Sequence, residues 1–406
     1  MAAIRQRQWT TESGKVKSAW IVRYDDQNGK ERQKTFNRRK DADKFALTAR
    51  VEVRDGVHVA ESDSATVGEA GELWISTATD DGLEETSLAQ YREHLDLHIK
   101  PFIGGMKLNR LSVPVIRTFS DDLRAEGRSA VMVRYVLRSF GSILSDAQER
   151  GLIIRNPVRE MRARRRRRKA DSHDKRDRLK TGVDIPTPEE MGAILRAATE
   201  PRDVAFLYTT AFSGLRSSEL RGLAWTANID LKNSELSVTQ RADRLNKIGA
   251  PKSEAAYRTI PLPAPACAAL REWKLACPKG PLGLVFPNAN GDVAWRTNLV
   301  EDIFWPAQIE AGVTVPVLDR HGRPQRDETG KSIVKPKYSG LHAVRHFFAS
   351  WCINRKADGG LELPPKTVQQ RMGHHSIVVT MDTYGHLFPS RDDNAALSEA
   401  AALLLR

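Results

Sequence analysis

Cysteine is scarce in this chain of 406 residues, which has only Cys267, Cys277 and Cys352. The odd number and the absence of a Cys-x-x-Cys pair argue against a disulfide framework and a cysteine zinc site. Long apolar runs are also missing, so no bilayer-spanning helix is predicted. The start, MAAIRQRQW, lacks the apolar stretch of a secretion signal. We therefore expect a cytoplasmic protein that does not associate with a membrane.

Positive charge is unevenly distributed along the chain. The net charge is +13, from 64 Lys and Arg against 51 Asp and Glu. Residues 1–60 carry +6 and residues 155–180 carry +9, so these two segments hold the whole excess. Such a distribution indicates a polyanionic partner, and we expect double-stranded DNA. The alternative is that these charge runs are only solvated surface.

Residues 1–60 are predicted to form a small β-sheet followed by a helix. Trp20, Val22 and Tyr24 alternate with other side chains at strand spacing, and Asn28-Gly29 is typical of a tight turn. Asn37 is suited to cap the helix that follows. We expect one exposed DNA-binding surface made of Arg5, Arg7, Arg32, Lys34 and Arg38. The alternative is a structural cap with incidental charge.

The rest of the chain suggests a multidomain α+β protein. After a short linker at 61–65, residues 66–157 have helical periodicity throughout and are predicted to form an all-α domain. Residues 158–186 are expected to be an extended basic linker, because dense like charges resist packing. Its cluster would follow the DNA backbone and consists of Arg164, Arg165, Arg166, Arg167, Arg168 and Lys169.

Residues 187–390 are predicted to form a mainly α-helical domain with a small antiparallel sheet. Helices are expected at 188–199, 201–212, 263–276 and from 342, and strands near 235–240 and 257–262. Residues 316–338 are rich in Arg, Lys, Gly and Pro, which indicates a surface hairpin or loop. A tail helix is predicted within 391–406.

Four short segments in this last domain place polar side chains among apolar ones. The first supplies Arg216 and Glu219 at helical i, i+3 spacing, and the second supplies Lys252 on a loop before a strand. The third supplies His342 and Arg345, and the fourth supplies His374 and Tyr384. A histidine zinc site is not expected, because His374 and His375 are adjacent and HExxH-like spacing is missing. Two arginines, a lysine and histidines around a tyrosine suit a phosphodiester, whose non-bridging oxygens guanidinium groups can clamp.

The ordered motifs SGLRSSEL, PKSEAAYRTIPL, LHAVRHFFAS and MGHHSIVVTMDTYGHLFP resemble the tyrosine recombinase family, particularly phage-type integrases. Residues 66–157 resemble the core DNA-binding domain of that family, and residues 1–60 its arm-site-binding domain. The resemblance implies a catalytic set with Glu219 in support, namely Arg216, Lys252, His342, Arg345, His374 and Tyr384. Met372 stands where the family commonly has leucine. Since His375 follows His374 directly, either can face the phosphate, and Gly373 favours His374.

The resemblance further implies a site-specific recombinase that cuts and rejoins DNA through a 3′-phosphotyrosine. It would need neither metal nor ATP, and it would integrate or excise a phage or mobile element in a bacterial cell. Tyr384 would attack, His342 by preference would take its proton, and Lys252 would protonate the leaving oxygen. Four protomers would assemble on DNA, with accessory proteins that bend DNA or set direction. The tail would dock onto a neighbouring protomer, and the alternative is that it packs in the core of its own chain. The alternatives are a type IB topoisomerase-like activity, a non-catalytic DNA-binding regulator and a metal-dependent nuclease.

Overall fold

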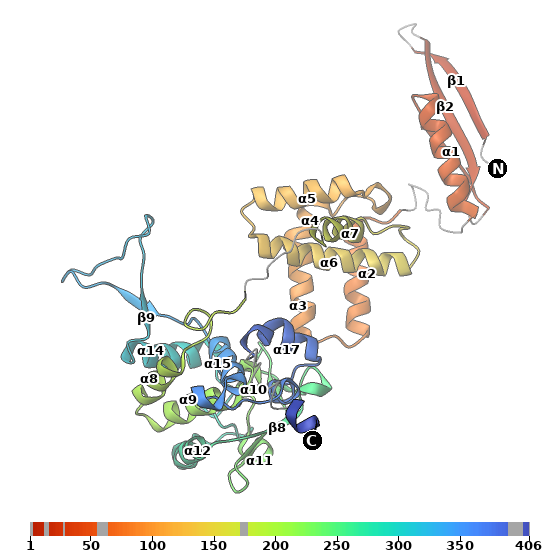
Figure 1. Cartoon of the computed structure of the whole chain (residues 1–406). Helices are drawn as coiled ribbons and strands as arrows, with labels where there is room; N and C mark the ends of the chain where they lie inside the picture. Colours follow the sequence, from red (N-terminus) through yellow and green to blue (C-terminus); the bar gives the residue numbers. More distant parts are fainter. Residues whose placement is uncertain are drawn as a thin grey trace. The chain divides into compact units, whose positions relative to one another are not determined.

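A computed structural model describes residues 3–11, 16–26, 29–54, 64–170, 178–388 and 401–405, without the side chains of residues 52 and 164–170. The chain divides into two compact units, residues 1–174 and 175–406 (Figure 1). Three sequence predictions fall wholly or largely outside the described residues: the turn residue Asn28, the linker at 61–65 and the tail helix at 391–406.

The first sixty residues contain the predicted sheet and helix. Strand β2 (Val16–Asp25) lies between β1 (Ala3–Thr10) and β3 (Glu31–Phe36) in an antiparallel sheet, and α1 (Arg39–Arg54) follows. Val22 and Tyr24 are buried together with Ala42, Ala46 and Ala49 of the helix. These small alanines let the helix approach the sheet closely.

The prediction that Arg32 and Lys34 lie on one exposed surface with Arg5, Arg7 and Arg38 is wrong. Residues paired across antiparallel strands lie on the same face of a sheet. Lys34 pairs with the buried Val22, so Lys34 and Arg32 lie on the face that the helix covers. There Arg32 Nε donates to Asp26 Oδ2 at 2.9 Å, and Lys34 Nζ lies 5.0 Å from the centre of the Phe45 ring. Both cations therefore have structural contacts.

The other three basic residues are exposed. Arg5 pairs with Ile21 and Arg7 pairs with Ala19, which places the two arginines on the face of the sheet opposite Val22. Arg38 precedes the helix and is also exposed. Only these three remain candidates for the predicted DNA-binding surface of the domain.

Residues 64–149 form the predicted all-α domain. A capping box between Thr66 and Glu69 starts its first helix, and Ser129 caps its longest one. Phe119 and Phe140 meet edge to face in its core, with ring centroids 5.8 Å apart. Its helical elements are α2 (Val67–Asp80), α3 (Glu85–Glu93), η1 (His94–Ile99), α4 (Lys100–Ile103), η2 (Leu108–Arg110), α5 (Val113–Ala125) and α6 (Ala130–Glu149).

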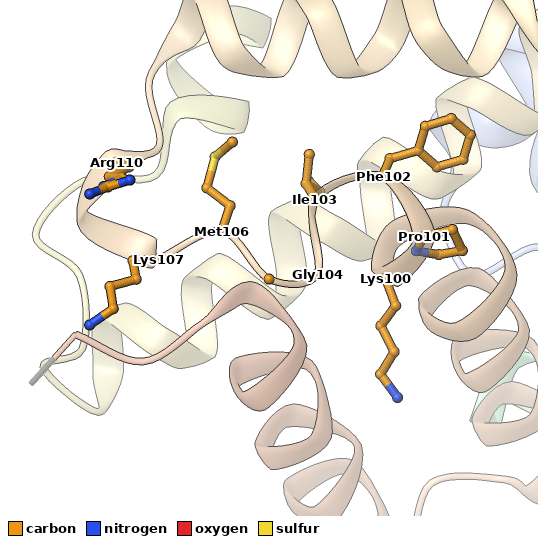
Figure 2. A pocket seen from close by; sticks show the side chains of 9 residues that line it. Lys100, Pro101, Phe102, Ile103, Gly104, Met106, Lys107 and Arg110 are labelled. Carbon is orange, nitrogen blue, oxygen red and sulfur yellow. The ribbon is translucent and has the colours of Figure 1, made fainter.

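An open hollow of about 730 Å³ lies along residues 100–110 of this domain (Figure 2). Lys100, Lys107 and Arg110 line it beside apolar residues. Lys100 Nζ is held by Glu72 Oε1 at 2.6 Å and by Asp96 Oδ1 at 2.7 Å. Three cations therefore line the hollow, and two carboxylates hold Lys100 within the domain.

The prediction of an extended segment after residue 157 is wrong for its first part, which is helix α7 (Pro157–Ala170). Asn156 starts the helix, since its Oδ1 accepts from the backbone N–H of Arg159 at 3.1 Å, and Pro157 occupies the first turn. Val158 is fully buried and packs against the domain core. The cap at Asn156 and the burial of Val158 therefore start the helix, and the repulsion between the arginines that follow does not prevent it.

The second unit confirms the predicted mixture of helices and short strands. Its first two helices are α8 (Pro188–Ala197) and α9 (Pro201–Ser213), and a capping box between Thr187 and Glu190 starts α8. The next elements are α10 (Ser217–Arg221), α11 (Trp225–Asn228), β4 (Ile229–Asp230), β5 (Glu235–Val238), β6 (Arg241–Ala242), β7 (Ile248–Gly249), η3 (Glu254–Ala256), β8 (Arg258–Pro261) and α12 (Ala264–Ala276).

The remaining elements of the unit surround one core. They are α13 (Arg296–Leu299), η4 (Val300–Phe304), α14 (Trp305–Glu310), β9 (Thr314–Pro316), β10 (Val334–Pro336), α15 (His342–Ile353), η5 (Lys356–Asp358), α16 (Pro365–Met372), α17 (Ile377–Tyr384) and η6 (Gly385–Leu387). Strands β4, β5 and β8 form an antiparallel sheet in that order. Among the described helices, none combines the length and apolar character that a bilayer span requires.

Residues 316–338 form the predicted surface hairpin. Between its two strands the chain makes two successive turns. Strands β9 and β10 pair antiparallel at its base (Figure 1). At the two tips, Asp319 and Asp327 each accept backbone N–H groups through Oδ1, and Gly322 and Gly330 adopt positive φ. The same Asp-x-x-Gly pattern thus closes both turns, because glycine tolerates the left-handed conformation.

Candidate active site

The site is built around Glu219, which lies in α10 immediately after a sharp change of direction. Gly214 ends α9 with a left-handed φ of 59°, and Arg216 takes the N-cap position of α10. Glu219 is 2% exposed. Its Oε2 accepts from the backbone N–H of Arg216 and its Oε1 from Nη1 of the same residue, both at 2.8 Å. The predicted support of Arg216 by Glu219 is therefore present as a geometric contact.

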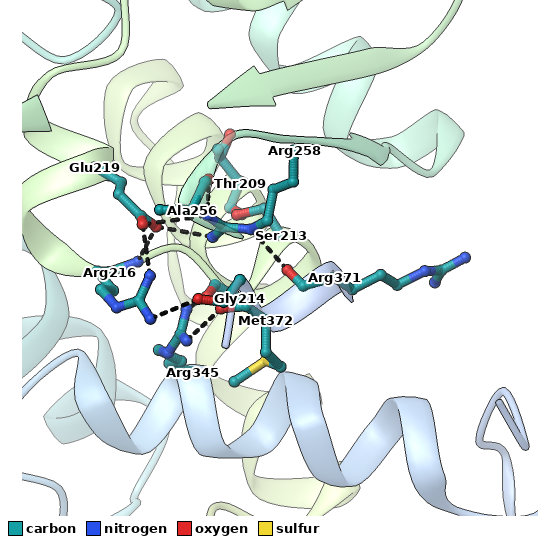
Figure 3. Close-up of polar contacts among 11 residues, drawn as sticks. Thr209, Ser213, Gly214, Arg216, Glu219, Ala256, Arg258, Arg345, Arg371 and Met372 are labelled. Carbon is teal, nitrogen blue, oxygen red and sulfur yellow. Dashed lines mark hydrogen bonds and ion pairs between the residues drawn. The ribbon is translucent and has the colours of Figure 1, made fainter. Parts of the chain in front are cut away.

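A second arginine, Arg258, completes this cluster, and it was not among the predicted site residues. It comes from β8, and its Nη1 and Nη2 donate to the two oxygens of Glu219 at 3.1 and 2.8 Å (Figure 3). Its Nε donates to the carbonyl of Arg371 at the end of α16. The sequence places Arg258 in the same motif as Lys252, but its partner is 39 residues away along the chain. We call Arg216, Glu219 and Arg258 the carboxylate cluster.

The carboxylate cluster keeps its acid ionised in spite of burial. Burial by itself raises the pKa of Glu219, but the hydrogen bonds and positive charges of Arg258 and Arg216 outweigh it and lower the pKa to about 2. Because this folded-state pKa lies below the ordinary 4.5, the associated stability is present above pH 4.5 and is lost as the pH falls towards 2.

Replacing Glu219 by Gln is expected to destabilise the second unit by about 3 kcal/mol at pH 7, because Arg258 would keep a buried charge without its counter-ion. Denaturant unfolding followed by hydrogen exchange in α10 and β8 measures this. The penalty should shrink as the pH falls from 4.5 towards 2, since Glu219 itself becomes protonated. Asp358→Asn, which breaks the exposed ion pair with Arg355, serves as a control and should have little effect. Equal effects of the two substitutions would contradict the role given to the cluster.

Arg345 is the most buried cation of the site, at 4% exposure. It lies on α15, where Nη1 donates to the carbonyl of Gly214 and Nη2 to that of Met372 at 2.6 Å (Figure 3). Arg216 Nη2 similarly donates to the carbonyl of Gly373 at 3.0 Å. Burial and the charge of Arg216 lower the pKa of Arg345 to about 9, which still leaves it protonated at pH 7.

Tyr384 ends α17 with its side chain inside this region, at 2% exposure. Its ring stacks on that of His374, with centroids 6.2 Å apart and planes 8° from parallel. Burial raises the pKa of Tyr384 to about 12, against the opposing effect of Arg345 and Arg216. The phenol is therefore protonated at neutral pH, and it needs a proton acceptor in order to act as a nucleophile.

Of the two adjacent histidines, His374 is the one that the structure brings to the arginines. Burial and the charges of Arg345 and Arg216 lower its pKa to about 4. Its Nδ1 lies 2.9 Å from the hydroxyl of the buried Thr380. His375 is exposed. The geometry therefore agrees with the preference for His374 that Gly373 suggested.

His346 is a second residue that the sequence analysis did not include. It lies on α15 next to Arg345, and its Nδ1 is 2.7 Å from the hydroxyl of Tyr384. The ring of His342, one turn earlier, meets it edge to face with centroids 5.0 Å apart. The sequence signal for His346 was its place in the HAVRH motif, but its contact with Tyr384 spans 38 residues and depends on how α15 packs against α17.

The two remaining predicted residues lie at the exposed side of the site. His342 is exposed at the start of α15, and partial desolvation with the charges of Arg345 and Arg216 lowers its pKa. Lys252 is exposed on the loop between β7 and η3, outside the buried network of Glu219, Arg258 and Arg345. Within the part of the chain that the structure describes, no group of three or more His, Cys, Asp or Glu is placed to hold a metal ion.

The chain matches two protein families in its two helical regions. Residues 186–391 match the phage integrase family, and residues 66–124 match the N-terminal SAM-like domain of phage integrases. The first match includes the whole set of site residues described above and spans about half of the chain.

Individual relatives agree with this assignment. A tyrosine recombinase XerC-like protein of Caldanaerobacter subterraneus subsp. tengcongensis is 24% identical over 91% of this chain and 92% of its own length. The integrase of the Tn1549 transposon in complex with transposon right-end DNA has the same fold over 84% of this chain and all of that chain, with a TM-score of 0.58 at 18% identity.

A lambda integrase tetramer bound to a Holliday junction also shares the fold, over 95% of this chain and 96% of that chain, with a TM-score of 0.52 at 15% identity. The extent of the family match, together with two arginines and a histidine gathered around a buried tyrosine, leads to one conclusion: the chain belongs to the phage integrase family of tyrosine recombinases, the enzymes of site-specific DNA recombination.

Proposed function

We propose that this protein is the integrase of a phage or other mobile element and that Tyr384 is its nucleophile. The observation that carries the proposal is the position of Tyr384, which is buried beside His374 and close enough to Arg345 and Arg216 for their charges to act on its pKa. A buried phenol near two guanidinium groups suits attack on a phosphodiester, because the guanidinium groups stabilise the charge that develops on phosphorus oxygens.

In this mechanism the Tyr384 oxygen attacks the scissile phosphate in line. A bond forms between this oxygen and phosphorus, the bond from phosphorus to the 5′-oxygen breaks, and a 3′-phosphotyrosine remains. Arg216 and Arg345 bind the non-bridging oxygens. Their contacts with the carbonyls of Gly214, Met372 and Gly373 support this role, because they fix each guanidinium before DNA arrives.

His374, His342 and Lys252 assist the transfer. When Nδ1 of His374 accepts from the Thr380 hydroxyl, its Nε2 carries the proton and can donate to a phosphate oxygen. His342 is suited to a second such contact from the exposed side. Lys252 gives a proton to the departing 5′-oxygen, and its exposed loop suits a residue that reaches the site when DNA is bound. The covalent intermediate conserves the bond energy, so ATP is not needed for rejoining.

The assembly is proposed to be a tetramer on DNA attachment sites in the bacterial cytoplasm. The lambda integrase structure that shares this fold is a tetramer bound to a Holliday junction. Leu403, Leu404 and Leu405 near the end of the chain are exposed, which supports docking of the tail onto a neighbouring protomer. Accessory proteins that bend DNA or set the direction would act on this assembly.

DNA contacts outside the active site are proposed for two regions. The first is the exposed face of the N-terminal sheet with Arg5 and Arg7, together with Arg38. The second is α7, which contains the basic cluster from Arg164 to Lys169. Phosphate contacts from such residues add affinity and register without reading bases.

Tyr384→Phe should abolish formation of the covalent protein–DNA adduct while binding to the core site changes by no more than a few fold. Only the attacking oxygen is removed, and the ring that stacks on His374 is kept. A suicide substrate incubated in EDTA and analysed by denaturing gel gives the result. Adduct formed by the Phe variant would exclude Tyr384 as the nucleophile.

Companion assays of DNA binding, of cleavage with and without magnesium, and of supercoil relaxation separate the three alternatives. DNA binding without an adduct from the unmodified protein would indicate a regulator, and cleavage that requires magnesium would indicate a nuclease. Relaxation of supercoils without strand exchange between two sites would indicate a topoisomerase.

Arg216→Lys and Arg345→Lys should each slow single-turnover cleavage by about 10²-fold or more, because lysine keeps the charge but cannot donate in a planar fork. Arg355→Lys, on an exposed helix end, is the control and should cleave at the normal rate. Thermal melting of each variant checks that the fold is intact. Near-normal cleavage by a folded Arg345→Lys variant would show that this residue is not a phosphate clamp.

Replacing the five arginines from 164 to 168 by Gln should weaken core-site binding broadly across sequences. The slope of log K against log salt should fall by roughly 0.9 for each DNA phosphate that the variant no longer neutralises. Single-turnover cleavage at saturating protein should change little, because none of these arginines is among the proposed catalytic residues. Filter binding at several salt concentrations measures the slope, and an unchanged slope would mean that α7 only presents solvated charge.

A further inference from the structure

We propose that His346 is the catalytic residue that accepts the proton of Tyr384 when the tyrosine attacks DNA and then releases it to solvent. The proposal rests on the proposed function of Tyr384. It differs from the assignment that the sequence favoured, in which His342 takes the proton. The distance of 2.7 Å between His346 Nδ1 and Tyr384 Oη is the observation that carries it.

The position of His346 meets the geometric requirement for a general base. A base must lie within hydrogen-bond reach of the proton that it removes, and His346 Nδ1 lies 2.7 Å from the Tyr384 oxygen. The ring centroids of His346 and Tyr384 are 5.7 Å apart and the ring planes are inclined at 63°. The Nδ1 edge of the imidazole faces the hydroxyl. His374, in contrast, stacks flat on the Tyr384 ring and has its Nδ1 at Thr380. Of the two histidines that contact Tyr384, only His346 addresses the hydroxyl.

The surroundings of His346 keep it neutral and therefore able to accept. Burial, followed by the charges of His342 and Arg345, lowers its pKa to about 4, with Asp184 acting in the opposite direction. A neutral imidazole with its proton on Nε2 has a lone pair on Nδ1 for the phenol O–H. His342 is exposed and touches the His346 ring edge to face, so the histidine favoured by the sequence adjoins the proposed acceptor.

The proton balance is closed over the two halves of the reaction. In cleavage the phenol proton moves to His346 Nδ1 as the Tyr384 oxygen bonds to phosphorus, and the 5′-oxygen leaves with a proton from Lys252. In rejoining a 5′-hydroxyl attacks the phosphotyrosine and gives its proton to Lys252, the bond from phosphorus to the Tyr384 oxygen breaks, and His346 takes up a proton from water and passes it to that oxygen. Neighbouring Arg345 makes the imidazolium a ready donor, because like charges favour its deprotonation.

His346→Asn tests the proposal, because asparagine can accept the hydrogen bond near the position of Nδ1 but cannot take up the proton. We expect single-turnover adduct formation on a suicide substrate to slow by about 10²-fold or more. His321→Asn, at an exposed ribbon tip, is the matched control and should cleave at the normal rate. His342→Asn is measured beside them. If this variant cleaves more slowly, fluorinated tyrosine at position 384 should not restore its rate.

A second measurement separates proton transfer from simple positioning. Fluorinated tyrosine incorporated at position 384 has a more acidic phenol and depends less on a base. It should restore most of the rate lost in His346→Asn. Failure of this rescue, or a His346→Asn variant that cleaves within about threefold of the unmodified protein or faster, would overturn the proposal. A rescue seen with His342→Asn instead would assign the proton to His342.

The two levels of proposal fail in different ways. Adduct formed by Tyr384→Phe would contradict the function proposed for Tyr384. Loss of adduct in Tyr384→Phe together with full activity in His346→Asn would contradict only the role of His346.

Discussion

The buried carboxylate of Glu219 is the contact on which the geometry of the active site depends. It accepts two bonds from Arg216 in its own helix and two from Arg258 in β8, and Arg258 also reaches the end of α16 through the carbonyl of Arg371. One acid therefore connects three elements that are separated along the chain. A buried ion pair of this kind contributes modestly to net stability, because desolvation offsets much of the attraction, but its loss leaves an uncompensated charge. Its main effect here is to fix where Arg216 points.

Two glycines allow the backbone to take part in the same arrangement. Gly214 and Gly373 have φ of 59° and 61°, and their carbonyls accept from Arg345 and Arg216, respectively. A Cβ at Gly214 would lie 2.2 Å from the Phe348 ring, and one at Gly373 would lie 2.8 Å from the Arg258 guanidinium. Neither position therefore has room for a side chain, and glycine also tolerates the left-handed φ at both. Met372, by contrast, contacts Arg345 through its carbonyl, so exchange of leucine for methionine there leaves the contact unchanged.

The sequence predicted those parts of the fold and the site that depend on local spacing. The helices at 188–199 and 201–212, the strands near 235–240 and 257–262 and the contact between Arg216 and Glu219 all follow from periodicity or from i, i+3 neighbours. Arg258 and His346 were missed because their partners lie 39 and 38 residues away and meet only after packing.

The errors in the other unit have equally physical causes. Arg32 and Lys34 were assigned to the wrong face because charge alone does not reveal strand pairing, which fixes the face of every side chain. The start of α7 was assigned to an extended linker because charge density was weighed above the cap at Asn156 and the burial of Val158.

Tyr384 lies beside the arginines and histidines of the same chain, and this bears on how many complete sites an assembly contains. Tyr384, Arg216, Arg345 and the two histidines that contact the tyrosine all come from residues 216–384 of one polypeptide. With the roles proposed above, we expect that two protomers inactivated at different members of this set do not complement each other by sharing a tyrosine. In the proposed tetramer every subunit would then carry the whole set, and we expect the order in which strands are cut to depend on how the subunits are held on DNA.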